Sequence, residues 1–291
     1  MRIENEFLSV DVTLDGGSLT SVYDKKNNVE LLYQKDERSW MGQDVVIFPI
    51  VARIKDGHVI VDGKEYSMKN HGLIRYNKLD VISNCSNELV LGFKYNENTL
   101  LQYPFKFNFE ICYKLNNNEL TIEYRVYNLD DKDMYFNVGG HPAFIVDGYE
   151  DDNGYVFDNV KLVFDKEYDI NQFLLTENGS FITTLKEVHI PQEMLITKNL
   201  IEEEKTLIYD VKNIDEVILQ TGNKKIIFDI SKALVLAVWT NPGYGNYLCV
   251  EPWWGLPDFD NHNKVLKDKN MITTLKANDQ YITDYKIKFE V

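Results

Sequence analysis

Two side chains in this sequence have local contexts that suit proton transfer. Glu251 follows the apolar run 247–250 and precedes Pro252, which biases the backbone of Glu251 towards an extended conformation. His141 follows two glycines and precedes Pro142, so its imidazole sits in a stiff local frame. A histidine that titrates near neutral pH and a carboxylate are suitable partners for general acid–base catalysis.

Each of these residues also has a structural interpretation. Glu251 would then be an exposed carboxylate at the end of a strand, and Trp253 and Trp254 would be core residues. His141 would be a buried histidine that hydrogen-bonds to the backbone. A carboxylate that leaves an apolar strand beside large aromatic rings nevertheless suits a site that grips a sugar and moves a proton.

Arg53, His71 and Arg75 supply further hydrogen-bond donors. Such side chains hold sugar hydroxyls, or an anionic group if the ligand carries one. In an acidic protein the commoner fate of an arginine is to pair with a surface carboxylate, and this alternative stays open for both arginines. His58, His189 and His262 lie in contexts that do not suggest a catalytic role.

Several classes of site are missing from the sequence. The chain contains no P-loop, no dinucleotide-binding glycine pattern, no C-x-x-C or H-E-x-x-H zinc motif and no G-x-S-x-G nucleophile motif. Its three cysteines, Cys85, Cys112 and Cys249, are far apart and form neither a disulfide framework nor a metal spacing. We therefore expect no metal, no cofactor and a reducing compartment, the cytoplasm.

The composition of the chain limits the classes of partner that it is expected to bind. The net charge of −15 argues against nucleic acid and anionic membranes as ligands. The N-terminus lacks the long apolar run of a secretory signal, and no segment has the roughly 20 apolar residues of a membrane helix. The oligomeric state is not set by these features, and a homodimer is an open alternative.

The elements that must position these residues are strands. Runs of β-prone residues separated by short polar turns recur along the chain, and helical periodicity is limited to one or two turns at residues 198–205. The clearest hairpins pair residues 58–61 with 64–68, 105–115 with 119–128, and 215–221 with 224–230. We predict one all-β domain over residues 1–291, a large antiparallel β-sandwich.

Several motifs, in this order, resemble the galactose mutarotase-like (aldose 1-epimerase) family, and most closely its LacX-type branch. The motifs are GGSLTSVYDK at 16–25, FPIVAR at 48–53, HGLIR at 71–75, YPF at 103–105, GGHPAF at 139–144 and CVEPW at 249–253. The resemblance covers nearly the whole chain. It implies a galactose mutarotase-type β-sandwich (supersandwich) that interconverts the α and β anomers of a monosaccharide.

The resemblance also implies roles for single residues. His141 matches the general acid of the family, and Glu251 matches the general base. His71 and Arg53 match residues that hold sugar hydroxyls, and Arg75 belongs to the same H-G-x-x-R segment. For the C–H face of the sugar we expect contact with Trp253, with Trp254 and Trp239 as alternatives. We also expect Glu251 to be ionised and His141 to be charged, because opposite charges that lie close together favour both charged forms.

Two positions depart from the family pattern. Lys205 stands where many members have a sugar-binding Asp, so a charged sugar becomes a candidate substrate. Ala52 stands where Gly is more usual, a change that matters little if φ at this position is negative.

Three alternatives to a mutarotase for neutral sugars stay open. The first is a hexose-6-phosphate epimerase, in which the phosphate would be held by cations such as Arg53, Arg75, Lys69 or Lys205. The second is a carbohydrate-binding or sensing protein that kept the fold without turnover. The third is a glycoside hydrolase or lyase, and a hydrolase would need a second carboxylate that the sequence does not place.

Overall fold

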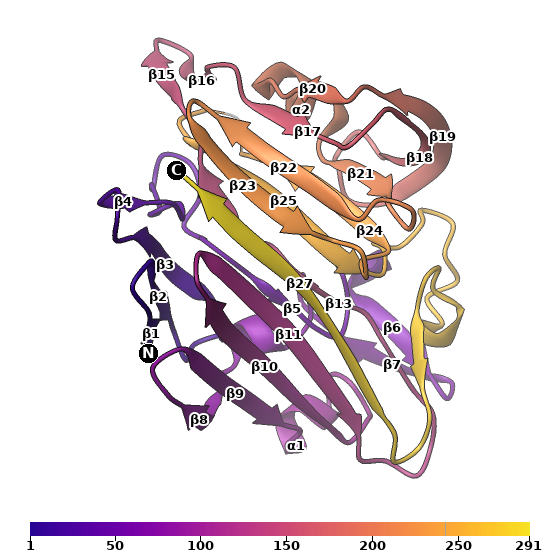
Figure 1. Ribbon diagram of the computed structural model, residues 1–291. Coiled ribbons are helices and arrows are strands. Elements are labelled where there is room, and N and C mark those ends of the chain that lie inside the picture. The colour runs from indigo at the N-terminus through magenta and orange to yellow at the C-terminus, as the bar shows by residue number, and fades with distance from the viewer. Residues whose placement is uncertain (242) are drawn as a thin grey trace.

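A computed structural model describes residues 1–241 and 243–291 and consists mainly of two large antiparallel sheets that face each other (Figure 1). The first has nine strands. In spatial order they are β20 (Glu193–Leu195), β17 (Lys161–Val163), β22 (Glu216–Thr221), β23 (Lys224–Asp229), β27 (Gln280–Glu290), β11 (Glu119–Asn128), β10 (Phe107–Asn116), β9 (Glu88–Lys94) and β8 (Asp80–Asn84).

The second large sheet has eight strands and carries the residues of the predicted site. In spatial order they are β19 (Ile182–Ile190), β18 (Tyr168–Leu175), β21 (Leu207–Asp210), β24 (Val235–Trp239), β25 (Tyr247–Trp254), β13 (Val138–Gly140) and β5 (Val46–Ile47), with β14 (Ala143–Ile145) also paired to β25. Glu251 therefore lies inside β25, and the prediction that it ends the strand is wrong. The strand continues because Pro252, Trp253 and Trp254 keep an extended backbone.

Smaller elements complete the chain. The remaining strands are β1 (Arg2–Glu4), β2 (Leu8–Val12), β3 (Leu19–Asp24) and β4 (Val29–Glu30) in one sheet, and the pairs β6 (His58–Val61) with β7 (Lys64–Ser67), β12 (Met134–Phe136) with β26 (Thr273–Leu275), and β15 (Gly148–Asp151) with β16 (Gly154–Phe157). The helices are α1 (Glu97–Leu100), α2 (Lys198–Glu204) and the 3-10 turns η1 (Lys55–Gly57), η2 (Ile74–Tyr76) and η3 (Leu266–Asp268).

The prediction of an all-β antiparallel sandwich is confirmed, and its physical basis is visible in β11. Alternate residues from Leu120 to Asn128 are buried and those between them are half-buried, as a period of two requires. The two large sheets share a core in which Tyr124 of β11 packs against Trp254 of β25, and Phe144 of β14 against Phe228 of β23. The three predicted hairpins and the short helix α2 are also present.

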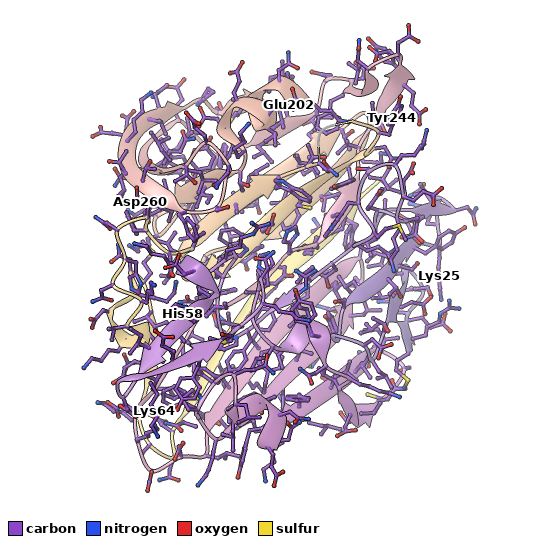
Figure 2. All side chains as sticks on the ribbon, turned by 180° about the vertical axis from the view of Figure 1, so that it is seen from behind. Lys25, His58, Lys64, Glu202, Tyr244 and Asp260 are labelled. Carbon is purple, nitrogen blue, oxygen red and sulfur yellow. The ribbon has the colours of Figure 1, made fainter. Side chains whose placement is uncertain are left out.

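Charged side chains lie mainly outside this core. Seen from behind with all side chains drawn, Lys64 and Glu202 lie at the periphery of the molecule (Figure 2). Among the described residues, no helix has both the length and the apolar character that crossing a membrane requires. The largest cluster of buried apolar residues includes residues from Ile3 to Phe289, and the assignment of residues 1–291 to one domain stays a prediction.

Strand β13 approaches the opposite sheet closely at Gly140. A Cβ atom on Gly140 would lie 2.3 Å from Tyr285 Oη and 2.9 Å from Tyr124 Oη. We expect Gly140→Ala to lower the free energy of unfolding by about 1–3 kcal/mol, the usual cost of overpacking a core, as measured by urea denaturation. The cost is expected to be smaller in a Tyr285→Phe background, because the nearest clashing atom is then absent. An equal cost in both backgrounds would contradict this origin of the destabilisation.

Candidate active site

A cleft of about 300 Å³ opens on the eight-stranded sheet and contains the predicted site. It is lined by all six side chains that the sequence predicts: Arg53, His71, Arg75, His141, Glu251 and Trp253. The other lining residues are Trp40, Val45, Ala52, Asn70, Asn178, Gly179, Ser180, Thr206 and Trp239. Loops far apart in the chain therefore meet over β24 and β25, and most of the lining side chains are polar or aromatic.

The register of one strand pair places His141 beside Glu251. Strand β25 pairs with β13 at Gly139↔Trp253 and with β14 at Ala143↔Cys249. Residues 140–142 and 250–252 lie between these two pairings, and His141 and Glu251 are the middle residues of the two segments. Proline has no N–H to donate to a ladder, so the prolines at 142 and 252 help to interrupt the pairing between the two segments.

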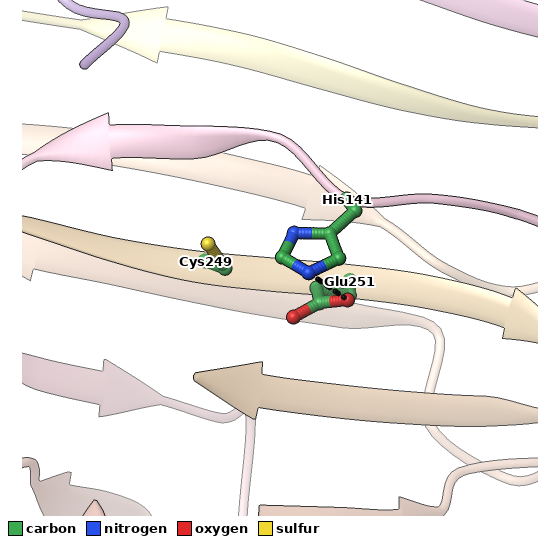
Figure 3. Close-up of side chains that lie close together, drawn as sticks. All are labelled: His141, Cys249 and Glu251. Atoms are coloured by element: carbon green, nitrogen blue, oxygen red, sulfur yellow. Dashed lines mark ion pairs between the residues drawn. The ribbon is translucent and has the colours of Figure 1, made fainter. Parts of the chain in front are cut away.

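The two side chains meet directly. His141 Nε2 lies 3.4 Å from Glu251 Oε2, and only 10% and 2% of the two side chains are exposed (Figure 3). Among the described residues, neither Glu251 Oε2 nor His141 Nδ1 has a hydrogen-bond partner. Buried polar atoms without partners are costly and uncommon, so these atoms are available to a ligand.

Burial controls the electrostatics of this pair. It lowers the pKa of His141 to about 3, together with the smaller effect of the Arg75 charge. Burial raises the pKa of Glu251 well above its usual range. The prediction that proximity favours both charged forms is therefore wrong for this cleft, because desolvation outweighs the attraction between the two groups.

Asp44 is a buried acid that the sequence patterns did not indicate. One of its carboxylate oxygens accepts the N–H of Leu19 at 2.9 Å. Burial raises the pKa of Asp44 to about 6, although backbone hydrogen bonds oppose this shift. When Asp44 is ionised, its charge adds to the increase in the pKa of Glu251. Asp44 does not line the cleft, so it affects the pKa of Glu251 through a long-range electrostatic interaction.

His71 is held as a neutral donor. Its Nδ1 accepts the backbone N–H of Ala52 at 3.2 Å, which leaves Nε2 to carry the proton. Burial lowers the pKa of His71 well below its usual value, and the nearby His141 and Arg75 add to this shift. The rings of His71 and His141 lie edge to face with centroids 5.4 Å apart. His71 therefore suits the binding of a hydroxyl oxygen next to the acid–base pair.

The two arginines of the cleft are not tied to carboxylates. Arg53 is exposed and Arg75 is half-buried, and neither forms an ion pair within 4.0 Å in the described part of the chain. Arg75 packs over the ring of Tyr76 at 5.0 Å. The structural alternative, in which both arginines pair with surface carboxylates, is therefore wrong, and both guanidinium groups are free to contact a ligand.

Three of the four tryptophans line the cleft. Trp254 is excluded as a sugar-binding residue, because it is buried in the core and its indole N–H donates to the carbonyl of Lys232. Trp253 is only 3% exposed and offers little free ring surface. Trp40 and Trp239 are half-buried and pack against the ring of His141 with centroids 5.2 and 5.7 Å away. Trp40 was not predicted, although a large aromatic in the polar segment 34–44 was a usable signal.

Lys205 lies outside the cleft. Its ammonium group donates to the carbonyl of Glu202 at 2.8 Å, and its side chain is exposed beyond the end of α2. The neighbouring Thr206 lines the cleft instead. Lys205 also borders an adjoining cavity that shares Thr206 and Trp239 with the cleft. The predicted replacement of a sugar-binding Asp by Lys205 therefore does not put a cation beside His141 and Glu251.

Comparison with known proteins identifies the family of the chain. A sequence model of the family described as aldose 1-epimerase matches residues 1–259. The chain belongs to the aldose 1-epimerase family. Protein LacX (plasmid) of Lactococcus lactis subsp. lactis is 25% identical over 303 residues, and the match covers 99% of this chain and 98% of LacX. The resemblance to the LacX-type branch is therefore confirmed.

Solved structures extend the family relation to the fold. The galactose mutarotase related enzyme from Lactobacillus acidophilus superposes with a TM-score of 0.92 at 26% identity, over 100% of this chain and 97% of that one. A galactose mutarotase-like protein from Lactobacillus casei ATCC 334 gives a TM-score of 0.93 at 24% identity, over 100% and 99% of the two chains. The galactose mutarotase-type sandwich is thus shown along the whole chain.

The backbone of Ala52 carries strain that a glycine would relieve. Its φ is 50°, so the negative φ under which the alanine was expected to matter little is not what the structure shows. A left-handed conformation costs an L-residue roughly 1–2 kcal/mol, and the extra chain entropy of glycine offsets about 0.5–1 kcal/mol of that relief. We expect Ala52→Gly to raise the free energy of unfolding by up to about 1.5 kcal/mol in urea denaturation. Ala143→Gly, within strand β14, is the control and is expected to destabilise; a loss of stability in both variants would contradict the strain at Ala52.

Proposed function

We propose that this protein is an aldose 1-epimerase that interconverts the α and β anomers of a hexose by acid–base catalysed ring opening and closure. The observation that carries the proposal is the His141–Glu251 pair, buried at 3.4 Å on the floor of a cleft of sugar size. An anomerase needs one proton donor and one proton acceptor close together, because the two oxygens that exchange protons, O1 and O5, are bonded to the same carbon.

The reaction uses only these two groups. The pair first moves its single proton from Glu251 to His141, the less favourable of its two arrangements because both groups are then charged. Glu251 then takes the proton of the O1 hydroxyl while His141 Nε2 delivers a proton to the ring oxygen O5, and the C1–O5 bond breaks to give the aldehyde. Rotation about C1–C2 presents the other face of the carbonyl. Ring closure then returns the O5 proton to His141 and the Glu251 proton to O1. No atom is lost, and the pair ends with the single proton with which it began.

Burial of the pair promotes this cycle. Burial destabilises both an imidazolium and a carboxylate. Ring opening takes a proton from the imidazolium and adds one to the carboxylate, so both groups become neutral at once. In the resulting neutral arrangement Glu251 holds the proton, which sets the pair for closure. In this proposal His71 and Arg53 hold hydroxyl groups, and Trp253 lines the cleft beside the carboxylate. The half-buried rings of Trp40 and Trp239 suit the C–H face of the sugar.

A phosphorylated hexose is the second candidate substrate. It is favoured by the guanidinium groups of Arg53 and Arg75, which line the cleft without an ion pair to a carboxylate in the described part of the chain. Such groups bind phosphate in bidentate fashion. The rates of anomerisation of glucose and glucose 6-phosphate, compared at equal concentration, distinguish the two substrates. A protein that only binds sugar would give saturable binding without acceleration on either one.

Removal of either proton carrier is expected to abolish most of the activity. A well-placed general acid or base contributes roughly 10²–10⁴ in rate, so Glu251→Gln and His141→Ala are each expected to reduce kcat at least 100-fold. Polarimetry on freshly dissolved α-glucose, α-galactose and α-glucose 6-phosphate measures the effect. Glu187→Gln and His189→Ala, at exposed positions on β19, are matched controls that are expected to keep the parental rate. A variant at 141 or 251 with the parental rate would refute its assigned role.

The pH profile is expected to stay flat below neutrality. Turnover requires that the pair carries one proton. If the pair carries two protons, Glu251 cannot accept another, and if it carries none, His141 cannot donate one. Burial lowers the pKa of His141 to about 3, so the second proton binds only far below the ordinary histidine pKa of about 6.5. We therefore expect kcat/KM, corrected for spontaneous mutarotation, to be unchanged between pH 7 and about pH 5. Asp44, with a pKa of about 6, also titrates in this range, so the profile is measured in an Asp44→Asn background as well. A loss of activity centred near pH 6.5 in both backgrounds would contradict the buried pair.

A further inference from the structure

A third side chain completes a set of metal-binding donors at the catalytic pair. His141, Cys249 and Glu251 are all buried, and one ligand atom from each lies within 4.8 Å of the other two. Cys249 and Glu251 are two residues apart on β25, so their side chains lie on the same face of the strand. His141 reaches this face from the adjacent segment between β13 and β14 (Figure 3). The mechanism uses the imidazole and the carboxylate and leaves the thiol without a role.

We propose that Cys249, His141 and Glu251 form a binding site for a thiophilic divalent transition metal of the Zn²⁺ type, and that the bound ion blocks the cleft. One thiolate sulfur, one imidazole nitrogen and one carboxylate oxygen are all established zinc ligands, and the sulfur disfavours Mg²⁺ and Ca²⁺. Three protein ligands leave the fourth tetrahedral position open towards the cleft. The binding part of this proposal is independent of the proposed function, and the inhibition part rests on it.

The three ligand atoms have to move slightly closer together to bind one metal ion. Metal–ligand bonds of about 2.0–2.3 Å in a tetrahedron set ligand separations of roughly 3.3–3.6 Å. His141 Nε2 and Glu251 Oε2 already lie 3.4 Å apart. The sulfur of Cys249 lies within 4.8 Å of one ring nitrogen of His141 and one carboxylate oxygen of Glu251. It therefore has to move closer to both, and the proposal assigns this movement to rotation about the Cα–Cβ bond of Cys249. Glu251 Oε2 is buried without a partner in the described part of the chain, as a site prepared for a ligand requires.

Charge balance favours an ion with two positive charges. Thiolate and carboxylate together cancel the charge of a divalent metal, and the imidazole binds as the neutral base, so the buried complex has no net charge. Binding releases the thiol proton and the proton that the acid–base pair holds. Arg75 lies close enough to disfavour a cation on His141, which makes the two anionic ligands necessary. A His141 whose ring nitrogen is bound to the metal cannot pass a proton to a sugar, and the metal lowers the basicity of the Glu251 carboxylate, so the bound ion blocks the proton exchange.

Cobalt(II) is a suitable probe, because a Co²⁺–thiolate bond gives a charge-transfer absorption that oxygen and nitrogen ligands do not. We expect the full-length protein, kept reduced, to bind one Co²⁺ with this absorption, and Zn²⁺ to displace it. Cys249→Ala and Cys249→Ser are expected to lose the absorption and to weaken Zn²⁺ binding at least tenfold, a lower bound for loss of a ligand. The serine variant keeps the size of the side chain in case the alanine variant does not fold.

Matched controls separate this site from adventitious binding. Cys85 is an exposed thiol, and His189 lies on the surface beside Asp169 and Glu167, so Cys85→Ala and His189→Ala remove the best surface ligands. Both controls are expected to retain the absorption and the Zn²⁺ affinity. No charge-transfer band in the parent protein, or the same band in both Cys249 variants, would overturn the proposed site.

The inhibition is tested separately. In the polarimetric assay we expect Zn²⁺ to raise the apparent KM for sugar in the parent protein, and the Cys249→Ser variant to need at least tenfold more Zn²⁺ for the same effect. Metal binding by absorption without any loss of turnover would overturn the inhibitory role and leave the site intact. Absence of turnover in metal-free protein would instead count against the proposed function, while the absorption measurements would still decide the metal site.

Discussion

The arrangement of the cleft depends on an interruption in one antiparallel ladder. Strand β25 pairs with β13 on one side of the break and with β14 on the other, in a single register. A histidine and a glutamate occupy the middle of the break, on facing strands. Pro142 and Pro252 flank them and cannot donate to the ladder. The facing side chains of a strand pair are neighbours, so the register itself brings acid and base together without a flexible loop.

The second constraint is the burial of this pair. A sheet strand buried along its whole length surrounds Glu251 with apolar neighbours, and the loops that carry Trp40 and His71 cover the rest. Desolvation then outweighs the mutual attraction of the two groups and makes their charges costly. The same property that makes the pair responsive to a sugar hydroxyl also makes it, together with Cys249, a set of ligands for a soft cation.

Much of the fold follows from local patterns in the sequence. Alternation in residues 119–128 and the turn residues at positions 62–63 and 222–223 predict hairpins that the structure contains, because period-two burial is a local property of strands. The site residues were found through family motifs, which carry information about long-range neighbours. Properties set by tertiary burial were not predictable in this way: the extension of β25 past Glu251, the direction of the pKa shifts, and the positive φ of Ala52. The proximity of Cys249 to His141 also depends on a pairing between distant segments.

The most direct test of the account is a crystal structure with a reducing hexose bound. The His141–Glu251 pair predicts that C1 of the sugar lies over the interrupted ladder, with O1 and O5 within about 2.6–3.2 Å of Glu251 and His141. Density for a sugar whose C1 points away from both side chains, or a sugar bound elsewhere while the space above the pair stays empty, would contradict the account.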